Sequence, residues 1–390
     1  MTICPKFLYS GPDVPWMNPQ CLGINTLPSR SNLYTYPSEK KAINADPLDS
    51  QWYLLLDGQW SFKLYRKPSE LEQGIIDPDY KDSVWDFIKV PGNWMMQGHD
   101  YPHYTNVQMP FSHQPPKVPE ENPTGVYRTN FIIPKGWKER RTVIHFGGVE
   151  SAFFVFCNGK MVGFGKDSRT PVEFDLSPWI KPDKNQLTVV VIRWSDGSFL
   201  EDQDHWWMAG IHRSVYLRST AKTYLEDVFP RAELNEELNS GSLEVEARVN
   251  FVGKVESGWK VGIKLIDPQE NQLFQSMPFE EIPLAEQTRI NLGHLIIIFK
   301  KVNKPKLWSS DKPNLYTVLV CLFDPSGNEV EWTSCKIGFR RIEIKNREML
   351  INGMPVLMQG VNRHEHDPVS GKTVTRESML EDIVLMKKYN

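Results

Sequence analysis

The sequence predicts a mainly β, multidomain protein, in which two β-sandwiches precede a single βα unit. Short strand-like runs separated by turn dipeptides fill residues 46–220, and longer strand-like runs fill residues 221–338. Residues 339–390 change to a strand, a polar loop and an amphipathic helix. Residues 1–45 are rich in Pro, Asn and Ser and are expected to form an extended arm. A chain of 390 residues has room for these domains.

Composition and charge exclude several classes of protein. The formal net charge of −3 shows no excess of basic residues of the kind that binds nucleic acid. No run approaches the roughly 18 apolar residues of a membrane span, and the N-terminus lacks the apolar core of a signal peptide. The five cysteines are scattered without CxxC spacing, which argues against structural zinc or a disulfide framework. We expect a soluble, cytoplasmic protein.

Turn dipeptides and apolar runs define the first block. Asp57-Gly58 joins two strand-like runs within residues 52–64, and Asn158-Gly159 does the same within residues 153–164. Both dipeptides suit type I′ turns and predict hairpins. Residues 187–194 form a continuous apolar strand, which is typical of a strand covered on both faces. The block reads as a β-sandwich or jelly roll.

The second block has the strand lengths and spacing of a small immunoglobulin-like sandwich. Its predicted strands are 242–251, 259–266, 292–299 and 316–323. The uncharged run from Leu295 to Phe299 is either a core strand or, if unpaired, an aggregation hazard.

The third block centres on the stretch 354–368. A hairpin turn at Asn352-Gly353 precedes a predicted buried strand over 356–361, and the hydrogen-bonding groups of 362–367 follow. Thr375 is a plausible N-cap for a helix over 376–388. A single βα unit cannot close a barrel, so we expect the chain to be truncated.

Several stretches could carry chemistry. Residues 193–213 hold four acids within nine residues and then paired tryptophans, which suits a polyol ligand or a hard cation such as Na⁺ or Mg²⁺. The alternative is a solvated acidic loop anchored by tryptophan. Residues 93–107 are crowded with amides, imidazoles and aromatic rings. His364 is either a ligand-binding residue or a histidine bonded to a backbone carbonyl. A metal site of His364, Glu365 and His366 is a weak prediction, because alternate strand residues face opposite sides.

Six strings carry a resemblance to a known family. The sequence resembles the bacterial β-galactosidases of glycoside hydrolase family two from about residue 16 onward. The matching strings are Pro91-Gly-Asn-Trp94, Tyr104-Thr-Asn-Val107, Glu121-Asn-Pro-Thr-Gly125, Phe174-Asp-Leu-Ser177, Trp194 to Asp204, and Gly360 to His366. The resemblance implies a jelly-roll sugar-binding domain, an immunoglobulin-like domain and the start of a (β/α)₈ barrel. It also implies retaining hydrolysis of β-D-galactosides such as lactose; β-glucuronidase or β-mannosidase is the weaker reading.

The resemblance assigns roles to three residues in the sugar site. Asn106 and Asp204 match positions that hydrogen-bond galactose, and Asp204 also matches a ligand of an active-site sodium ion. His364 matches the histidine that binds the galactosyl hydroxyls and stabilises the transition state. We expect these groups to tighten their contacts as the ring flattens toward an oxocarbenium ion.

An outer magnesium site is implied at Asn18 and Asp196, completed by an acid at position 15 and an amide at position 166. This sequence has Pro15 and Lys166 instead. We therefore expect that the divalent site is lost and that an ammonium group stands in the place of the ion.

The resemblance places the two catalytic glutamates and the active-site magnesium ligands after Asn390. Glu365 belongs to a different motif and is not expected to replace them. The chain alone is therefore expected to be inactive. The alternatives are a non-catalytic carbohydrate-binding or assembly module, or one half of a split enzyme that another chain completes. Full-length relatives are commonly homotetramers.

Overall fold

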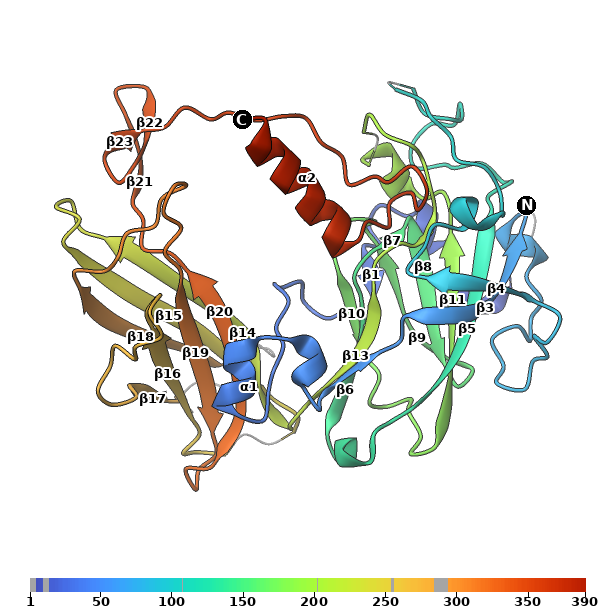
Figure 1. Ribbon diagram of the computed structural model, residues 1–390. Helices are drawn as coiled ribbons and strands as arrows, with labels where there is room; N and C mark the ends of the chain where they lie inside the picture. Colours follow the sequence, from blue (N-terminus) through green and yellow to red (C-terminus); the bar gives the residue numbers. More distant parts are fainter. Residues whose placement is uncertain (1–4, 10–13, 107, 202, 254–255, 284–293) are drawn as a thin grey trace.

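The computed structural model describes residues 5–9, 14–106, 108–201, 203–253, 256–283 and 294–390. Figure 1 shows two β-sandwiches side by side, with the short helix α1 (Glu39–Asn44) between them. Helix α2 (Arg376–Lys388), in red, lies at the top of the same view. The predicted succession of sandwiches is confirmed.

The first sandwich contains a seven-stranded and a four-stranded antiparallel sheet. In spatial order the seven strands are β1 (Gly23–Ile24), β9 (Lys160–Lys166), β8 (Ala152–Cys157), β11 (Lys184–Ile192), β5 (Thr124–Ile132), β3 (Gly58–Tyr65) and β4 (Asp86–Val90). The four are β10 (Val172–Asp175), β6 (Arg141–Phe146), β13 (Val215–Thr220) and β2 (Tyr53–Leu55), and β7 (Val149–Glu150) pairs separately with β12 (Gly210–Ile211). The 3₁₀ helices are η1 (Lys6–Leu8), η2 (Pro15–Met17), η3 (Pro47–Asp49), η4 (Pro68–Glu70), η5 (Trp94–Gln97), η6 (Lys135–Trp137) and η7 (Asp196–Phe199).

Strand β11 is covered on both faces, as its continuous apolar run predicts. Val189 and Val191 belong to the core between the two sheets. Val190 and Ile192 face the opposite way and pack in a second cluster, which includes Trp16 of the N-terminal arm. Part of the arm therefore serves as the cover for the outer face of the large sheet.

The two predicted hairpin turns have different outcomes. Asn158 and Gly159 both have positive φ angles, as a type I′ turn requires, and they join β8 to β9. The hairpin predicted at Asp57-Gly58 is wrong. Of that pair only Gly58 has a positive φ, and the chain leaves β2 in the small sheet to enter β3 in the large one. The Asp57 carboxylate accepts a hydrogen bond of 2.8 Å from the Val215 amide, so it secures this change of sheet.

The second sandwich has a three-stranded sheet and a four-stranded sheet. In order these are β14 (Thr223–Leu234), β15 (Ser240–Phe251) and β18 (His294–Asn303), and β17 (Phe279–Glu281), β16 (Lys260–Ile266), β19 (Tyr316–Phe323) and β20 (Glu329–Ile337). The first two residues of the predicted strand 292–299 lie outside the described residues. Strand β18 pairs with β15 and buries Ile296 and Ile298, whereas Leu295, Ile297 and Phe299 are exposed on its other side. The run is therefore half core strand and half exposed apolar row.

The third block differs most from the prediction. Strands β21 (Ile342–Lys345), β22 (Glu348–Ile351) and β23 (Met354–Pro355) include the predicted turn at Asn352-Gly353. The buried strand predicted over 356–361 is wrong: these residues form no strand, and Leu357 is 84% exposed. A buried strand needs neighbouring strands that hydrogen-bond to its backbone N–H and C=O groups. No described strand pairs with residues 356–361.

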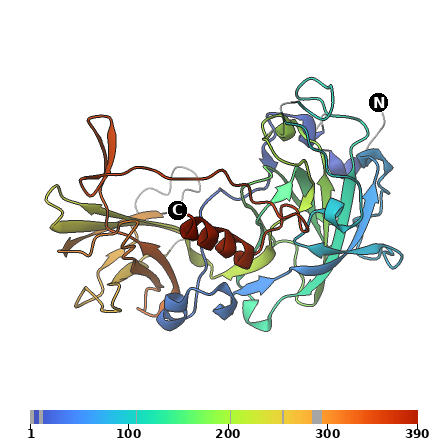
Figure 2. The same ribbon diagram turned by 45° about the horizontal axis from the view of Figure 1, so that its top comes forward.

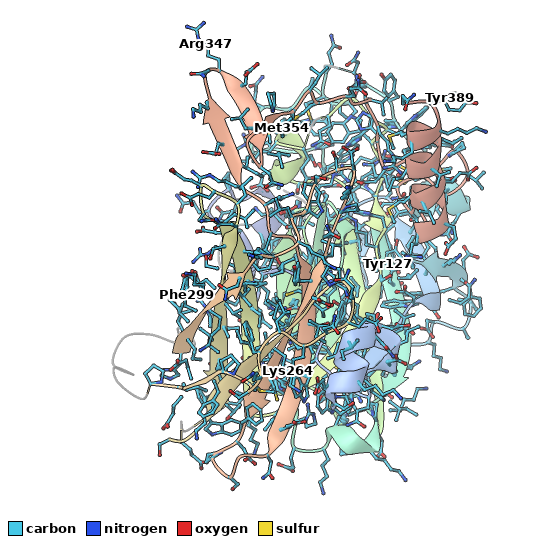
Figure 3. The ribbon with its side chains drawn as sticks, turned by 60° about the vertical axis from the view of Figure 1, so that its left-hand side comes forward. Tyr127, Lys264, Phe299, Arg347, Met354 and Tyr389 are labelled. Carbon is cyan, nitrogen blue, oxygen red and sulfur yellow. The ribbon has the colours of Figure 1, made fainter. Side chains whose placement is uncertain are left out.

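Helix α2 begins at the predicted residue, but none of its residues is buried. The Thr375 hydroxyl accepts a hydrogen bond of 3.2 Å from the Ser378 amide and caps the first turn. No residue of α2 is buried, and Leu380, Ile383 and Val384 are more than half exposed. Figure 3 shows the β21–β22 hairpin, with Arg347 at its tip, projecting away from the sheets.

A buried carboxyl lies where the first sandwich passes to the second. Glu331 of β20 is fully buried and accepts a hydrogen bond of 2.6 Å from the Leu225 amide of β14. Burial raises the pKa of Glu331 to about 7, against the opposing effects of that hydrogen bond and of Arg140 and Arg218.

This raised pKa predicts a pH-dependent stability. In the unfolded chain the Glu331 carboxyl ionises near its ordinary pKa of about 4.3, so its contribution to stability is lost as pH rises toward 7. Glu331→Gln keeps an acceptor for Leu225 and removes this titration. The stability of the variant relative to wild type should rise between pH 5 and pH 8 in denaturant titrations. The exposed control Glu348→Gln should show no such trend, and a trend equal in both variants would contradict the prediction.

Candidate functional site

Two loops of the first sandwich carry Asn106 and Asp204, and both residues are exposed. The loops are joined by backbone hydrogen bonds between His103 and Trp207, of 3.2 and 2.7 Å. The Tyr104 hydroxyl donates a further hydrogen bond of 2.7 Å to Asp204 Oδ1. The structure therefore connects the segment that contains Asn106 with the segment that contains Asp204. Val107 and Asp202 lie outside the described residues.

His364 reaches the same loop from the other end of the chain. Its ring lies edge-on to the ring of His205, with 5.9 Å between the centroids. His364 itself is exposed. The structure thus brings His364 and the residue after Asp204 together, although 159 positions separate His205 from His364 (364 − 205).

His205 was not singled out from the sequence, although it lies within the acidic stretch that was. Its Nδ1 lies 3.0 Å from the Trp206 carbonyl and its Nε2 lies 3.0 Å from an Arg169 guanidinium nitrogen. A carbonyl only accepts and a guanidinium only donates, so Nδ1 carries the proton and Nε2 accepts. Burial, with help from Lys372 and Arg169, lowers the pKa of His205 to about 4. The ring is therefore neutral at pH 7.

A small polar cavity of about 100 Å³ adjoins these two histidines. It is lined by Arg169, Gln203, His205, His212, Arg213, His364, Glu365, His366 and Lys372. Its lining brings Gln203 and His205, which flank Asp204, together with the His364 segment.

A turn after His366 fixes the position of this segment on the first sandwich. Asp367 and Gly371 exchange backbone hydrogen bonds of 2.8 and 2.9 Å. The Lys372 amide then donates 2.8 Å to Asn93 Oδ1, and the Lys372 ammonium donates 2.8 and 2.9 Å to the Glu150 carboxylate. Gly371 has φ +69°, and a Cβ there would meet Asn93 at 2.8 Å. The turn therefore needs glycine at that position.

The Lys372–Glu150 ion pair is buried, with 6% and 3% of the two side chains exposed. Burial raises the pKa of Glu150, but Lys372, Arg169 and His212 outweigh burial and hold that pKa below its ordinary value. Glu150 is thus ionised at neutral pH and paired with Lys372 and, at 3.5 Å, with Arg169. None of Glu150, Lys372 and Arg169 was identified from the sequence, because no local motif links them.

The two predicted cation sites differ in the groups that surround them. Asp204 is one exposed carboxylate, and the described residues contain no group of three or more His, Cys, Asp or Glu side chains arranged for a metal ion. At Asn18 and Asp196, the Lys166 ammonium lies 3.0 Å from the Asn18 carbonyl oxygen and 2.9 Å from each Asp196 oxygen. A divalent ion does not fit beside this ammonium.

Three consecutive family models match the chain. The sugar-binding domain of glycosyl hydrolases family 2 matches residues 54–221, the second family 2 domain matches 223–340, and the TIM barrel domain matches 342–390. The chain belongs to glycosyl hydrolase family 2. The start of the family 2 barrel domain thus corresponds to the block that contains His364.

Curated relatives of this family 2 chain include several β-galactosidases. Those of Psychromonas ingrahamii and Vibrio cholerae are 41% and 40% identical over 379 and 383 residues, which cover 96% of this chain in each case. The β-galactosidase of Priestia megaterium is 37% identical over 396 residues. The chain spans only 36–38% of the length of these relatives.

Solved structures of other proteins share the fold. Bacteroides uniformis β-glucuronidase aligns with a TM-score of 0.69 at 21% identity, over 86% of this chain and 38% of that one. A β-glycosidase from Bacteroides vulgatus aligns with a TM-score of 0.67 at 22% identity. No helix among the described residues is long and apolar enough to span a membrane.

The buried ion pair gives a prediction about stability. Lys372→Met leaves the Glu150 carboxylate buried with Arg169 as its nearest cation, so the variant should lose about 3–5 kcal/mol of unfolding free energy. The exposed Lys387→Met, in the last turn of α2, should change it by less than about 0.5 kcal/mol. Denaturant titration measures both variants.

A double variant separates the ion pair from simple loss of packing. Glu150→Gln combined with Lys372→Met removes both charges, so its loss should be smaller than the sum of the two single losses. Strict additivity of the two single substitutions would contradict a stabilising ion pair.

Proposed function

We propose that this chain forms the substrate-orienting part of a retaining β-galactosidase that hydrolyses β-D-galactosides of the lactose type. The observation that carries the proposal is the meeting of the Asp204 loop with the His364 segment, which the Lys372–Glu150 ion pair holds together. The β-galactosidase relatives at about 40% identity support galactose over glucuronate or mannose.

In this proposal the described side chains bind and orient the sugar. The Asn106 amide can both donate hydrogen bonds to galactose hydroxyls and accept them, whereas the Asp204 carboxylate only accepts them. Asp204 is also one ligand of a sodium ion that would balance local charge. His364 bonds the hydroxyls of the reacting ring. Contacts that strengthen as the ring flattens lower the barrier to reaction.

Bond cleavage with retention requires two carboxyl groups about 5 Å apart that both reach the sugar. The described acids near the cavity are poorly suited to this role. Glu150 is held in a buried ion pair, and Glu201 accepts hydrogen bonds from the amide and hydroxyl of Ser168. Glu365 has 60% of its side chain exposed and lies 3.8 Å from Arg363. We infer that residues outside 1–390, in the same or another polypeptide, supply the nucleophile, the acid/base and the ligands of an active-site Mg²⁺.

Turnover tests the proposal. The purified 1–390 chain should release no chromophore from a chromogenic β-galactoside above a buffer blank, because the two carboxyl groups are not supplied. Hydrolysis that persists after further purification and is lost in Glu150→Gln or Glu365→Gln would contradict this assignment.

Calorimetry with D-galactose separates the alternatives. A stand-alone carbohydrate-binding module would bind galactose through the chain alone and would lose that binding in Asp204→Asn, while Glu348→Gln would retain it. The enzyme proposal predicts that strong binding appears only when the remaining barrel is present.

A further inference from the structure

Several polar contacts attach the N-terminal arm to the first sandwich, among them the buried Arg30–Glu173 ion pair and a buried contact next to η2. The 3₁₀ helix η2 inserts Trp16 into the cluster on the outer face of the large sheet. One residue beyond η2, the Asn18 carbonyl oxygen faces the Lys166 ammonium at the end of β9. Asp196, the first residue of η7, completes the contact. Three segments that lie far apart in the sequence therefore converge on one ammonium group.

The geometry satisfies the ammonium completely. Lysine has three N–H donors, and Nζ has three oxygen acceptors at 3.0, 2.9 and 2.9 Å. The side chains of Lys166 and Asp196 are each 8% exposed, so water screens the pair weakly. Asp196 Oδ1 also accepts a hydrogen bond of 3.0 Å from the Gly197 amide, which fixes the carboxylate.

These distances are those of N–H···O hydrogen bonds and differ from those of metal ligation. Oxygen ligands lie at about 2.0–2.1 Å from Mg²⁺ and at 2.3–2.6 Å from Ca²⁺. An ion that used the Asn18 and Asp196 oxygens would displace the ammonium and bury it without a partner. Position 15, where the family pattern has an acid, is a buried proline here and offers no carboxylate.

Charge is conserved by this exchange. A divalent ion with two carboxylates is neutral, and one ammonium with one carboxylate is neutral as well. We propose that the Lys166 ammonium replaces the divalent cation at the Asn18–Asp196 site, so that the arm docks on the sandwich without a metal ion. The inference concerns attachment of the arm and does not depend on the proposed activity.

The first test uses the unmodified chain. Crystals soaked in Mn²⁺ should show no anomalous peak between the Asn18 carbonyl and Asp196. The midpoint of thermal unfolding should be the same in EDTA and in MgCl₂ at matched ionic strength. A Mn²⁺ peak at these two residues would overturn the proposal, whether or not Mn²⁺ also binds at other sites.

The second test uses Lys166→Gln, which keeps a polar end on the side chain and removes the charge. In EDTA this variant should unfold roughly 5 °C or more below wild type, because Asp196 loses its buried partner. Millimolar Mg²⁺ should restore part of the loss by neutralising Asp196. The matched control Lys63→Gln, whose ion pair with Glu72 is 3.4 Å long and about half exposed, should behave as wild type in both buffers. A midpoint equal to wild type in EDTA would overturn the proposal. If the variant does not fold, the Mn²⁺ soak of wild type decides.

Discussion

The arrangement of the candidate site depends on the buried ion pair between Lys372 and Glu150. Exposed ion pairs contribute little to stability, but a buried pair that loses one member leaves an uncompensated charge. Lys372 therefore cannot leave the first sandwich without a large cost, and the turn from Asp367 to Gly371 stays with it. His364 lies eight residues before Lys372 along the chain, and its ring contact with His205 follows from that attachment.

The ion pair explains why residues 367–373 lie against the first sandwich while the segments before and after them are exposed to solvent. Residues 367–373 make hydrogen bonds to Asn93, Glu150 and His212. On one side, Leu357 and Met358 are exposed; on the other, α2 buries no residue. Figure 2, a second view of the molecule, shows this red segment crossing to the first sandwich before it enters α2. The polar anchor, rather than an apolar core, therefore sets the position of the segment.

A second lysine, Lys166, holds the N-terminal arm in a similar way. Lys166 joins the arm, β9 and η7 through Asn18 and Asp196, as Lys372 joins the last block to Asn93 and Glu150. In both places a lysine ammonium reaches both oxygens of a carboxylate on a distant segment, and at Lys166 it also reaches a backbone carbonyl oxygen. Each ammonium is satisfied by oxygen acceptors, which is the condition under which a buried charge is tolerated.

The sequence was informative wherever a local pattern determines the structure. Asn158-Gly159, the double-faced strand β11 and the Thr375 cap each depend on neighbours within a few residues, and each was predicted. The hairpin prediction at Asp57-Gly58 failed because the two flanking strands enter different sheets. Strand β2 pairs with β13, and strand β3 pairs with β5. The strand predicted over 356–361 failed because burial requires neighbouring strands. Asp204 and His364 were proposed as site residues from the family resemblance. The contact between Glu150 and Lys372 was not predicted, because these residues are 222 positions apart and no sequence motif links them.

Hydrogen–deuterium exchange of residues 367–373 tests the attachment of the His364 segment most directly. The Gly371 and Lys372 amides donate to Asp367 and Asn93, so they should exchange at least about tenfold more slowly than amides of 356–361, and Lys372→Met should abolish that protection. Exchange of 367–373 as fast as that of 356–361 in the unmodified chain would contradict the claim that the buried ion pair holds this segment on the sandwich.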